Sequence, residues 1–298
     1  MNHPFRGTGV ALVTPFKEQA VDYQALTRLV EHCIKGGVNF LVALGTTGET
    51  ATLSVKEQQQ VLHHIITINQ GRLPVVAGFG GNNTAALVAQ IEAADFEGID
   101  GILSASPAYN KPTQEGIYQH FMAIQAVAPR PIILYNVPGR TASNMTAATT
   151  LRLANASDKF VAVKEASGNL HQVMQIIKGE KPADFAVLSG DDNLTLPMIA
   201  AGAEGLISVV ANAYPTAYSE LVKNARKGQL ETARTLHYDY MELVDALFVD
   251  GNPAGVKYVL EQLGVCGASL RLPLVAPTTA TKSLLEQLMN NLPVPSIS

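Results

Sequence analysis

Apolar runs of strand length recur through the first two-thirds of the chain, and their spacing constrains the fold more than any other feature. Successive runs begin 20 to 34 residues apart, which leaves room for one helix and two loops between neighbouring strands. Many runs are almost continuously apolar, as strands buried on both faces of a parallel sheet are. The expected strands are 9–13, 40–45, 74–78, 101–105, 131–136, 160–165, 185–190 and 205–210.

Helical patterns with recognisable ends separate these runs. Ser54 and Glu57 form a capping box, Asn83 precedes another helical pattern, and Gly36 and Gly37 end the first. Eight strand–helix units in sequence favour a closed (β/α)8 barrel, the TIM barrel, over an open doubly wound α/β sheet.

The strand pattern stops after about residue 214, and helical patterns follow. They fill residues 217–227, 230–248, 253–263 and 278–290. We therefore expect a catalytic barrel at residues 1–226 and a C-terminal helical domain, an extension of the barrel, at residues 227–298.

Composition excludes several classes of protein. The 298 residues carry a net charge of −4 without a basic block, which argues against nucleic acid and anionic membranes as partners. The two cysteines cannot form a disulfide framework, which fits a reducing compartment. The first residues lack the apolar core of a secretion signal, and no apolar run reaches the ~18 residues that span a bilayer. A cytoplasmic protein is expected.

Lys164 closes the apolar run that begins at Phe160, at the end of a strand where barrel enzymes place their chemistry. Burial disfavours the charged ammonium and favours the free amine, the nucleophile that imine formation with a carbonyl requires. From position alone, a lysine that reaches solvent or pairs with a carboxylate is equally compatible. The side chain of Glu165 should point to the opposite face of the strand and be structural.

The stretch from Gly45 to Glu49, Gly-Thr-Thr-Gly-Glu, follows the second expected strand. Its two hydroxyls, Thr46 and Thr47, and its exposed amides can hold a carboxylate. The stretch is too short for a Walker loop and lacks the lysine of that motif, so a nucleotide is not expected. An ordinary strand-to-loop turn is the alternative.

Two tyrosines and an arginine follow neighbouring strands. Tyr109 comes after the fourth strand and Tyr135 ends the fifth, where phenols can pass protons to a lysine or threonine within hydrogen-bond reach. Arg140 offers a forked donor suited to a carboxylate. Ordinary packing for each tyrosine, and a surface ion pair for Arg140, remain open.

No metal site is expected. Asp191 and Asp192 lack a third ligand at suitable spacing and fit better as a helix N-cap ahead of Thr195. His63 and His64 are neighbours on a helix and face different directions. We predict an enzyme without metal or cofactor.

Three motifs occur together and in order: Gly-Thr-Thr-Gly-Glu at 45–49, Tyr-Asn-Val-Pro-Gly-Arg-Thr at 135–141, and Val-Lys-Glu-Ala-Ser-Gly-Asn at 163–169. In this combination the chain resembles the dihydrodipicolinate synthase family of pyruvate-dependent class I aldolases. The resemblance runs from about residue 9 to residue 274 and includes Asn252-Pro253 followed by Lys257.

The resemblance implies a lyase of lysine and diaminopimelate biosynthesis. Lys164 would form an imine with pyruvate, and the derived enamine would attack the aldehyde of aspartate 4-semialdehyde. The amine of the adduct would then displace Lys164 and close the ring of 4-hydroxy-tetrahydrodipicolinate. The family forms tetramers, often as dimers of dimers, so a homotetramer is implied.

The resemblance also implies roles for the other site residues. Tyr135, Thr46 and Tyr109 would relay protons, with Tyr109 reaching in from a neighbouring subunit. Thr46 and Thr47 would hold the pyruvate carboxylate, and Arg140 the carboxylate of the semialdehyde. Gly190 and Ile207 would line the lysine pocket, Ile207 through its backbone.

Two other functions are alternatives. One is a different pyruvate-dependent aldolase, such as N-acetylneuraminate lyase or a 2-oxo-3-deoxy sugar acid aldolase; Arg140 favours a small carboxylated aldehyde over a polyhydroxylated chain. The other is a non-catalytic barrel that binds a ligand, against which the intact set of Lys164, Tyr135, Thr46 and Tyr109 argues.

Departures from the family pattern concern regulation. Lysine-inhibited members commonly have a tyrosine and a glutamate where this chain has Ala108 and Ala86, and histidines where it has Val55 and Gln58. Because a desolvated dication needs a carboxylate partner, we expect weak or absent lysine inhibition. Phe79 replaces part of a frequent Gly-Thr-Gly and is expected to narrow the barrel near the third strand.

Overall fold

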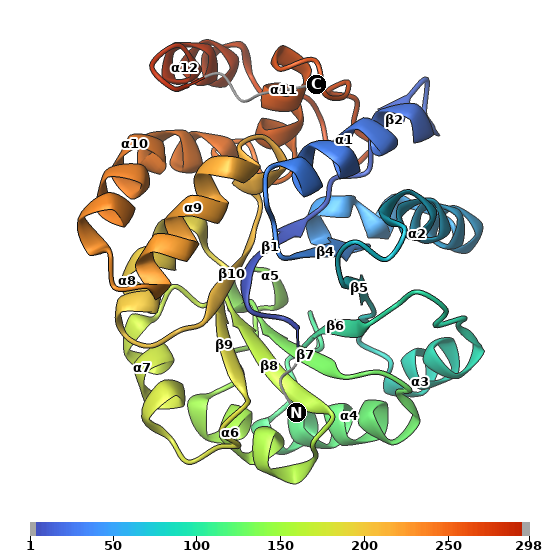
Figure 1. Cartoon of the computed structure of the whole chain (residues 1–298). Coiled ribbons are helices and arrows are strands. Elements are labelled where there is room, and N and C mark those ends of the chain that lie inside the picture. Colours follow the sequence, from blue (N-terminus) through green and yellow to red (C-terminus); the bar gives the residue numbers. More distant parts are fainter. Residues whose placement is uncertain (1–3, 294–298) are drawn as a thin grey trace.

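The computed structural model describes residues 4–293, so the ends of the two predicted domains, residues 1–3 and 294–298, lie outside it. Eight parallel strands close into a barrel in the order β1-β10-β9-β8-β7-β6-β5-β4, and the helices surround them (Figure 1). The predicted TIM barrel is confirmed. The barrel strands are β1 (Gly7–Ala11), β4 (Phe40–Ala43), β5 (Val75–Gly78), β6 (Gly101–Ala105), β7 (Ile132–Asn136), β8 (Phe160–Glu165), β9 (Ala186–Ser189) and β10 (Gly205–Ser208).

The predicted strands all exist, with small errors at their ends. The first was placed two residues too late: β1 ends at Ala11, and the Val13 amide donates to the Asn212 side chain (3.1 Å) instead of to a strand. β10 ends before Val209, because that residue adopts a right-handed helical backbone ahead of the 3-10 helix η4 (Val210–Asn212).

A short hairpin escaped the sequence analysis. β2 (Phe16–Lys17) and β3 (Ala20–Val21) pair antiparallel across Glu18 and Gln19, which both have positive φ. Two-residue hairpin turns of this kind usually carry Asn or Gly, and Glu18 and Gln19 are neither, so this turn was not predicted.

The helices follow the predicted alternation with the strands, and their capping residues are largely as expected. Ser54 and Glu57 form the capping box of α2, and the Asn83 side chain caps α3. The helices around the barrel are α1 (Tyr23–Lys35), α2 (Val55–Asn69), α3 (Thr84–Ala93), α4 (Gln114–Val127), α5 (Pro138–Thr141), α6 (Ala147–Ala156), α7 (Leu170–Lys178), α8 (Thr195–Ala200) and α9 (Pro215–Arg226). Short 3-10 helices are η1 (Thr46–Gly48), η2 (Thr50–Thr52) and η3 (Asp192–Leu194).

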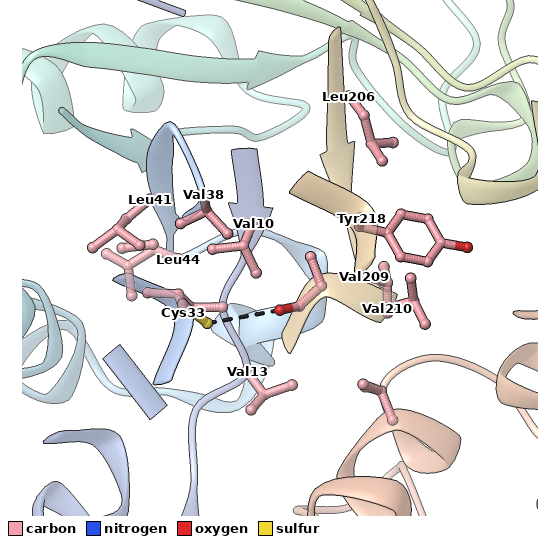
Figure 2. Packing of buried hydrophobic residues seen from close by; sticks show 14 of the residues in the cluster. Val10, Val13, Cys33, Val38, Leu41, Leu44, Leu206, Val209, Val210 and Tyr218 are labelled. Atoms are coloured by element: carbon pink, nitrogen blue, oxygen red, sulfur yellow. Dashed lines mark hydrogen bonds between the residues drawn. The ribbon is translucent and has the colours of Figure 1, made fainter. Parts of the chain in front are cut away.

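Side chains alternate between two cores along each strand. Phe40 and Val42 fill the barrel interior, whereas Val10 and Leu41 pack beneath the helices. Figure 2 shows part of the outer core, with Cys33 of α1 beside these strands and a long contact from its Sγ to the Ala211 carbonyl (3.8 Å). Both cysteines are buried and free.

The C-terminal helices lie together on one side of the barrel (Figure 1). α10 (Leu230–Phe248), α11 (Ala254–Gln262) and α12 (Thr279–Met289) match the predicted ranges within two residues. α10 packs against α9 and α12. The predicted boundary at residue 226 coincides with the end of α9, and a division into two domains stays a prediction. Within residues 4–293, no helix has the length and apolar character needed to cross a membrane.

Candidate active site

A cavity of about 600 Å³ opens at the carboxyl ends of four neighbouring strands. Loops after β4 and β5, the ends of β6 and β7, and residues far along the chain line it. Polar lining residues include Thr46, Glu49, Tyr135, Arg140 and Asn252. This end of a (β/α)8 barrel is where substrates bind, so the cavity is the candidate active site.

Lys164 and Tyr135 lie side by side in the barrel. Their Cα atoms are register partners on β8 and β7, and Lys164 Nζ lies 4.5 Å from the centroid of the Tyr135 ring. Both side chains are buried, at 5% and 8% exposed. In the part of the chain that the structure describes, no carboxylate pairs with Lys164. Across the described residues, the structure therefore lacks the ion pair that the sequence left open for Lys164.

Gly190 leaves the space that the lysine side chain occupies. A Cβ at this position would lie 3.1 Å from Lys164 Cε and 2.6 Å from the Cβ of Ala166. Ile207 is buried in the barrel interior on β10. The structure thus places Gly190 against Lys164, as the resemblance implied, and Ile207 inside the same barrel.

Glu165 faces away from the cavity, as strand alternation predicted, and is structural. Its carboxylate accepts hydrogen bonds from Asn136 Nδ2 (3.0 Å), Gln172 Nε2 (3.1 Å) and the Ser167 amide (2.8 Å). These bonds tie the ends of β7 and β8 to α7. They fix the backbone next to Lys164 without using its amine.

The two threonines sit on the 3-10 turn η1 directly after β4. Thr46 is exposed and lines the cavity, whereas Thr47 is buried and its Oγ1 accepts a hydrogen bond from Asn252 Nδ2 (3.0 Å). The Gly48 carbonyl accepts from Thr14 Oγ1 (2.7 Å). A Cβ on Gly48 would lie 3.2 Å from the Leu12 carbonyl oxygen, so this close approach favours glycine.

Arg140 lies on the short helix α5, where it is exposed and lines the cavity. Across residues 4–293 its guanidinium forms no ion pair. The surface ion pair considered from the sequence is not formed, and the forked donor is available to a carboxylate.

Tyr109 is a predicted catalytic residue whose side chain lies in solvent, away from the cavity of its own chain. It is 88% exposed, its φ is +70°, and its amide donates to the Thr141 carbonyl (3.2 Å). The structure therefore brings Thr46, Tyr135 and Arg140 to one cavity, with Lys164 beside Tyr135, and projects Tyr109 into solvent.

Asp191 and Asp192 both have structural roles, and the sequence predicted only the capping role. Asp191 caps η3, the turn before α8, whereas α8 itself has no side-chain cap. Asp192 is buried and accepts from Ser208 Oγ and the Val209 amide, and burial raises the pKa of this carboxyl to about 6. Within the described chain, no group of three potential metal ligands occurs.

Phe79 packs outward from its strand as well as lining the cavity. Its ring stacks on Phe96 with centroids 5.5 Å apart, in the core beneath the helices.

At the positions expected to bear on lysine inhibition, Val55 is 70% exposed, and the Gln58 amide donates to the Thr50 and Leu53 carbonyls.

Two contributions to this region were missed by the sequence analysis. Asn252 lines the cavity, and Lys257 forms a fully buried ion pair with Glu49. Lys257 lies on α11 and Asn252 in the turn before it, and the sequence offered both only as part of a motif without a role. Spacing along the chain cannot reveal contacts between residues 205 and 208 positions apart.

Known proteins match this chain over nearly its whole length. The model of the "Dihydrodipicolinate synthetase family" matches residues 4–292. A 4-hydroxy-tetrahydrodipicolinate synthase of Parabacteroides distasonis is 50% identical and covers 97% of each chain. One from Flavobacterium psychrophilum is 52% identical over 91% of this chain and 93% of that protein. A crystal structure of the chloride-inhibited dihydrodipicolinate synthase of Acinetobacter baumannii, complexed with pyruvate, is 39% identical, covers 96% and 98% of the two chains, and superposes with a TM-score of 0.92.

Proposed function

The chain belongs to the dihydrodipicolinate synthetase family and has 4-hydroxy-tetrahydrodipicolinate synthase activity, and we propose that this lyase reaction proceeds through an imine between Lys164 and pyruvate. The observation that carries the proposal is the lysine itself. Its amine lies inside the barrel, 4.5 Å from the Tyr135 ring, beside a glycine and without a carboxylate partner in the described chain. The pyruvate complex of the A. baumannii relative supports pyruvate as the first substrate.

Imine formation joins Lys164 Nζ to the carbonyl carbon of pyruvate and releases water. Loss of a methyl proton gives the enamine, whose carbon attacks the aldehyde of aspartate 4-semialdehyde and forms the new carbon–carbon bond. The aldehyde oxygen takes up a proton and becomes the hydroxyl. The amine of the adduct then attacks the imine carbon and displaces Lys164, which closes the ring and frees the lysine.

The carboxylates of the two substrates are assigned to different residues. Thr46 and Thr47 hold the carboxylate of pyruvate through hydroxyl and amide donors, and Arg140 holds that of the semialdehyde. Gly190 leaves room for the lysine, and the Ile207 backbone completes the wall. Exposed Arg140 at the mouth of the cavity fits a small charged aldehyde better than the polyhydroxylated acceptors of sugar-acid aldolases.

A direct test compares acceptors. With pyruvate as donor, aspartate 4-semialdehyde should be condensed about 10²-fold more efficiently than N-acetylmannosamine or an aldose. A neutral acceptor would leave the Arg140 guanidinium without a carboxylate partner. Equal or faster turnover with a sugar acceptor would overturn the assignment of Arg140.

The proton relay combines Tyr135, Thr46 and Tyr109, with Tyr109 supplied by a second copy of the chain in a homotetramer. The exposure of Tyr109, and its absence from the cavity of its own chain, support this arrangement. Closed homo-oligomers exchange such residues reciprocally between paired subunits.

Mixing two inactive variants tests the relay. In a pair of Lys164→Ala and Tyr109→Phe subunits, one site receives both an intact lysine and an intact tyrosine. Random re-association of equal amounts should therefore restore about one quarter of wild-type activity in a reciprocal pair. Activity no greater than the sum of the two separate variants would place Tyr109 in the site of its own chain or outside the reaction.

A further inference from the structure

The loop that carries Thr46 and Thr47 is held in part by residues of the C-terminal segment that follows α10. Asn252 donates to Thr47 Oγ1 (3.0 Å), Lys257 forms an ion pair with Glu49, and the Arg271 amide donates to Glu49 Oε2 (3.1 Å). These partners lie between 205 and 222 positions along the chain from the loop. The loop also has the hydrogen bonds of its own 3-10 turn, donated by the Gly48 and Glu49 amides, and one donated by Thr14 Oγ1. The C-terminal segment adds bonds from distant positions in the chain.

Among residues 4–293, Asn252 is the cavity-lining residue of this segment whose side chain donates to the loop. It lies between α10 and α11, follows Gly251 with φ +86°, and is 7% exposed. It lines the same cavity as Thr46, Tyr135 and Arg140. A buried amide at this place costs free energy unless it is hydrogen-bonded, and its bond goes to Thr47.

The polarity of this hydrogen bond determines what Thr47 can do. An amide nitrogen only donates, so Thr47 Oγ1 must accept from Asn252 and keeps its own O–H for another partner. Among residues 4–293, this hydroxyl donates to no protein acceptor. A carboxylate only accepts, and a carboxylate in the cavity is therefore the complementary partner.

The ion pair beyond Thr47 fixes the backbone of the same turn. Glu49 has left-handed backbone angles (φ 52°, ψ 34°), which residues other than glycine adopt only at a cost in conformational free energy. Its carboxylate is held by Lys257 and the Arg271 amide, and Lys257 Nζ also donates to the Ser269 carbonyl (2.8 Å). Lys257 Nζ lies 4.2 Å from the Phe16 ring as well. With the turn fixed, the direction of the Thr47 O–H is set by Asn252.

We propose that Asn252 is a positioning residue for the 2-oxo acid: it occupies one lone pair of Thr47 Oγ1 and so directs the Thr47 hydroxyl proton at the substrate carboxylate. The inference rests on the proposed role of Thr47 in binding pyruvate. It makes the C-terminal helices part of the donor-substrate site and gives Asn252 no contact with the reacting atoms.

Borohydride trapping of the pyruvate imine measures the effect without the second substrate. The pyruvate concentration that gives half-maximal trapping should rise about 10-fold in Asn252→Ala, which loses one hydrogen bond in the binding site. It should rise further in Asn252→Asp, which has the same shape but accepts the Thr47 proton and adds a negative charge. The maximal extent of trapping on Lys164, and the KM for aspartate 4-semialdehyde, should stay near wild type in both variants.

A double-mutant cycle with Thr47→Val separates positioning from a general structural effect. If Asn252 acts through the Thr47 hydroxyl, adding Asn252→Ala to Thr47→Val should raise the half-saturation concentration no further. Tyr258→Phe is the control, because it removes a hydrogen bond to Glu286 within the same C-terminal helices and leaves the loop untouched. Thermal unfolding identifies any variant that fails to fold, and Asn252→Asp, which is isosteric, keeps the test available.

The outcomes are distinct. Wild-type half-saturation in folded Asn252→Asp, or additive effects of Asn252→Ala and Thr47→Val, would overturn the positioning role and leave the proposed function intact. An equal rise in Tyr258→Phe would overturn it too, since the effect would then belong to the stability of the helices. A wild-type protein that traps no pyruvate would overturn the proposed function and this inference with it.

Discussion

The two halves of the candidate active site are held in different ways. The lysine half, Lys164 with Tyr135 and Gly190, belongs to adjacent barrel strands whose backbones are in register, and the bonds of Glu165 secure the strand end. The threonine half, Thr46 and Thr47, sits on a 3-10 turn that is anchored by Thr14 and by side chains of the C-terminal segment. Barrel strands therefore place the proposed nucleophile, whereas the proposed carboxylate site also depends on the segment that follows the barrel.

Removing the nucleophile should have the largest effect on activity and almost none on the fold. Lys164→Ala should lower kcat by about 10⁴-fold or more, because covalent catalysis is lost. Its melting temperature should not fall, since a buried amine without a carboxylate partner contributes little to stability. Steady-state assays and calorimetry measure both; a variant that retains a tenth of wild-type turnover would remove Lys164 from the reaction.

Breaking the Lys257–Glu49 ion pair should have the opposite balance of effects, with a large loss of stability. Lys257→Met leaves the Glu49 carboxylate buried without its charge partner, which should cost about 3–5 kcal/mol of unfolding free energy. The pyruvate concentration needed for half-saturation should rise at the same time. The double variant Glu49→Gln/Lys257→Met should recover much of the stability, because no charge is then left unpaired. Urea unfolding of the wild type and of both variants measures the stabilities. A loss below about 1 kcal/mol in Lys257→Met would contradict the dependence of the threonine half on the C-terminal segment.

Arg140 belongs to neither half and should act on the second substrate alone. Arg140→Ala removes a charge-assisted hydrogen bond, so the KM for aspartate 4-semialdehyde should rise about 10- to 100-fold. Half-saturation by pyruvate should not change. An equal rise for both substrates would mean that Arg140 shapes the cavity as a whole and does not recognise the second carboxylate.

Glu57 links the C-terminal segment to α2 at the protein surface and should have a small, pH-dependent effect. Its hydrogen bonds with the Arg271 guanidinium, and then with the Ser54 backbone, lower the pKa of this carboxyl to about 2. A lowered carboxyl pKa adds stability that is present above the unfolded value of 4.5 and is lost as the pH falls through about 2. Glu57→Gln should therefore cost about 1 kcal/mol or less at pH 7, given solvent screening.

The difference in unfolding free energy between wild type and Glu57→Gln, followed from pH 7 downwards, checks this sign. It should shrink as the pH falls below 4.5. A difference that grows on acidification would mean that the charged carboxylate does not stabilise the native state.

Free lysine should have the smallest effect. The residues at the expected regulatory positions, Ala86 and Ala108, offer no carboxylate or phenol to a bound dication. Millimolar lysine should leave turnover nearly unchanged in initial-rate assays. Strong inhibition would require a different set of partners for the ammonium groups, and the variant Ala86→Glu provides the matched gain-of-inhibition comparison.

The lysine half was predictable from the sequence and the support of the threonine half was not. Apolar continuity identified β8, and a charged residue closing that strand identified Lys164 before any contact was known. Strand alternation also predicted that Glu165 would be structural. These features depend on periodicities of a few residues, which a single sequence displays directly.

Contacts between distant segments leave no such pattern. Asn252 falls between two predicted helices and Lys257 within the second, and nothing in their spacing indicates that they meet Thr47 and Glu49. The sequence placed Tyr109 after the fourth strand, and only the family resemblance implied that its side chain serves a neighbouring subunit; in the structure that side chain is 88% exposed. Pairing of this kind is decided by the closure of the barrel and the packing of α11 against it, which local sequence does not encode.

The most direct test of the account is reduction of the protein with borohydride in the presence of pyruvate, followed by intact mass measurement and peptide mapping. We expect one reduced pyruvate unit per chain, located on Lys164, and no adduct in Lys164→Ala. A folded wild-type protein without an adduct, or an adduct located on another lysine such as Lys257, would contradict the central claim that Lys164 is the imine-forming residue.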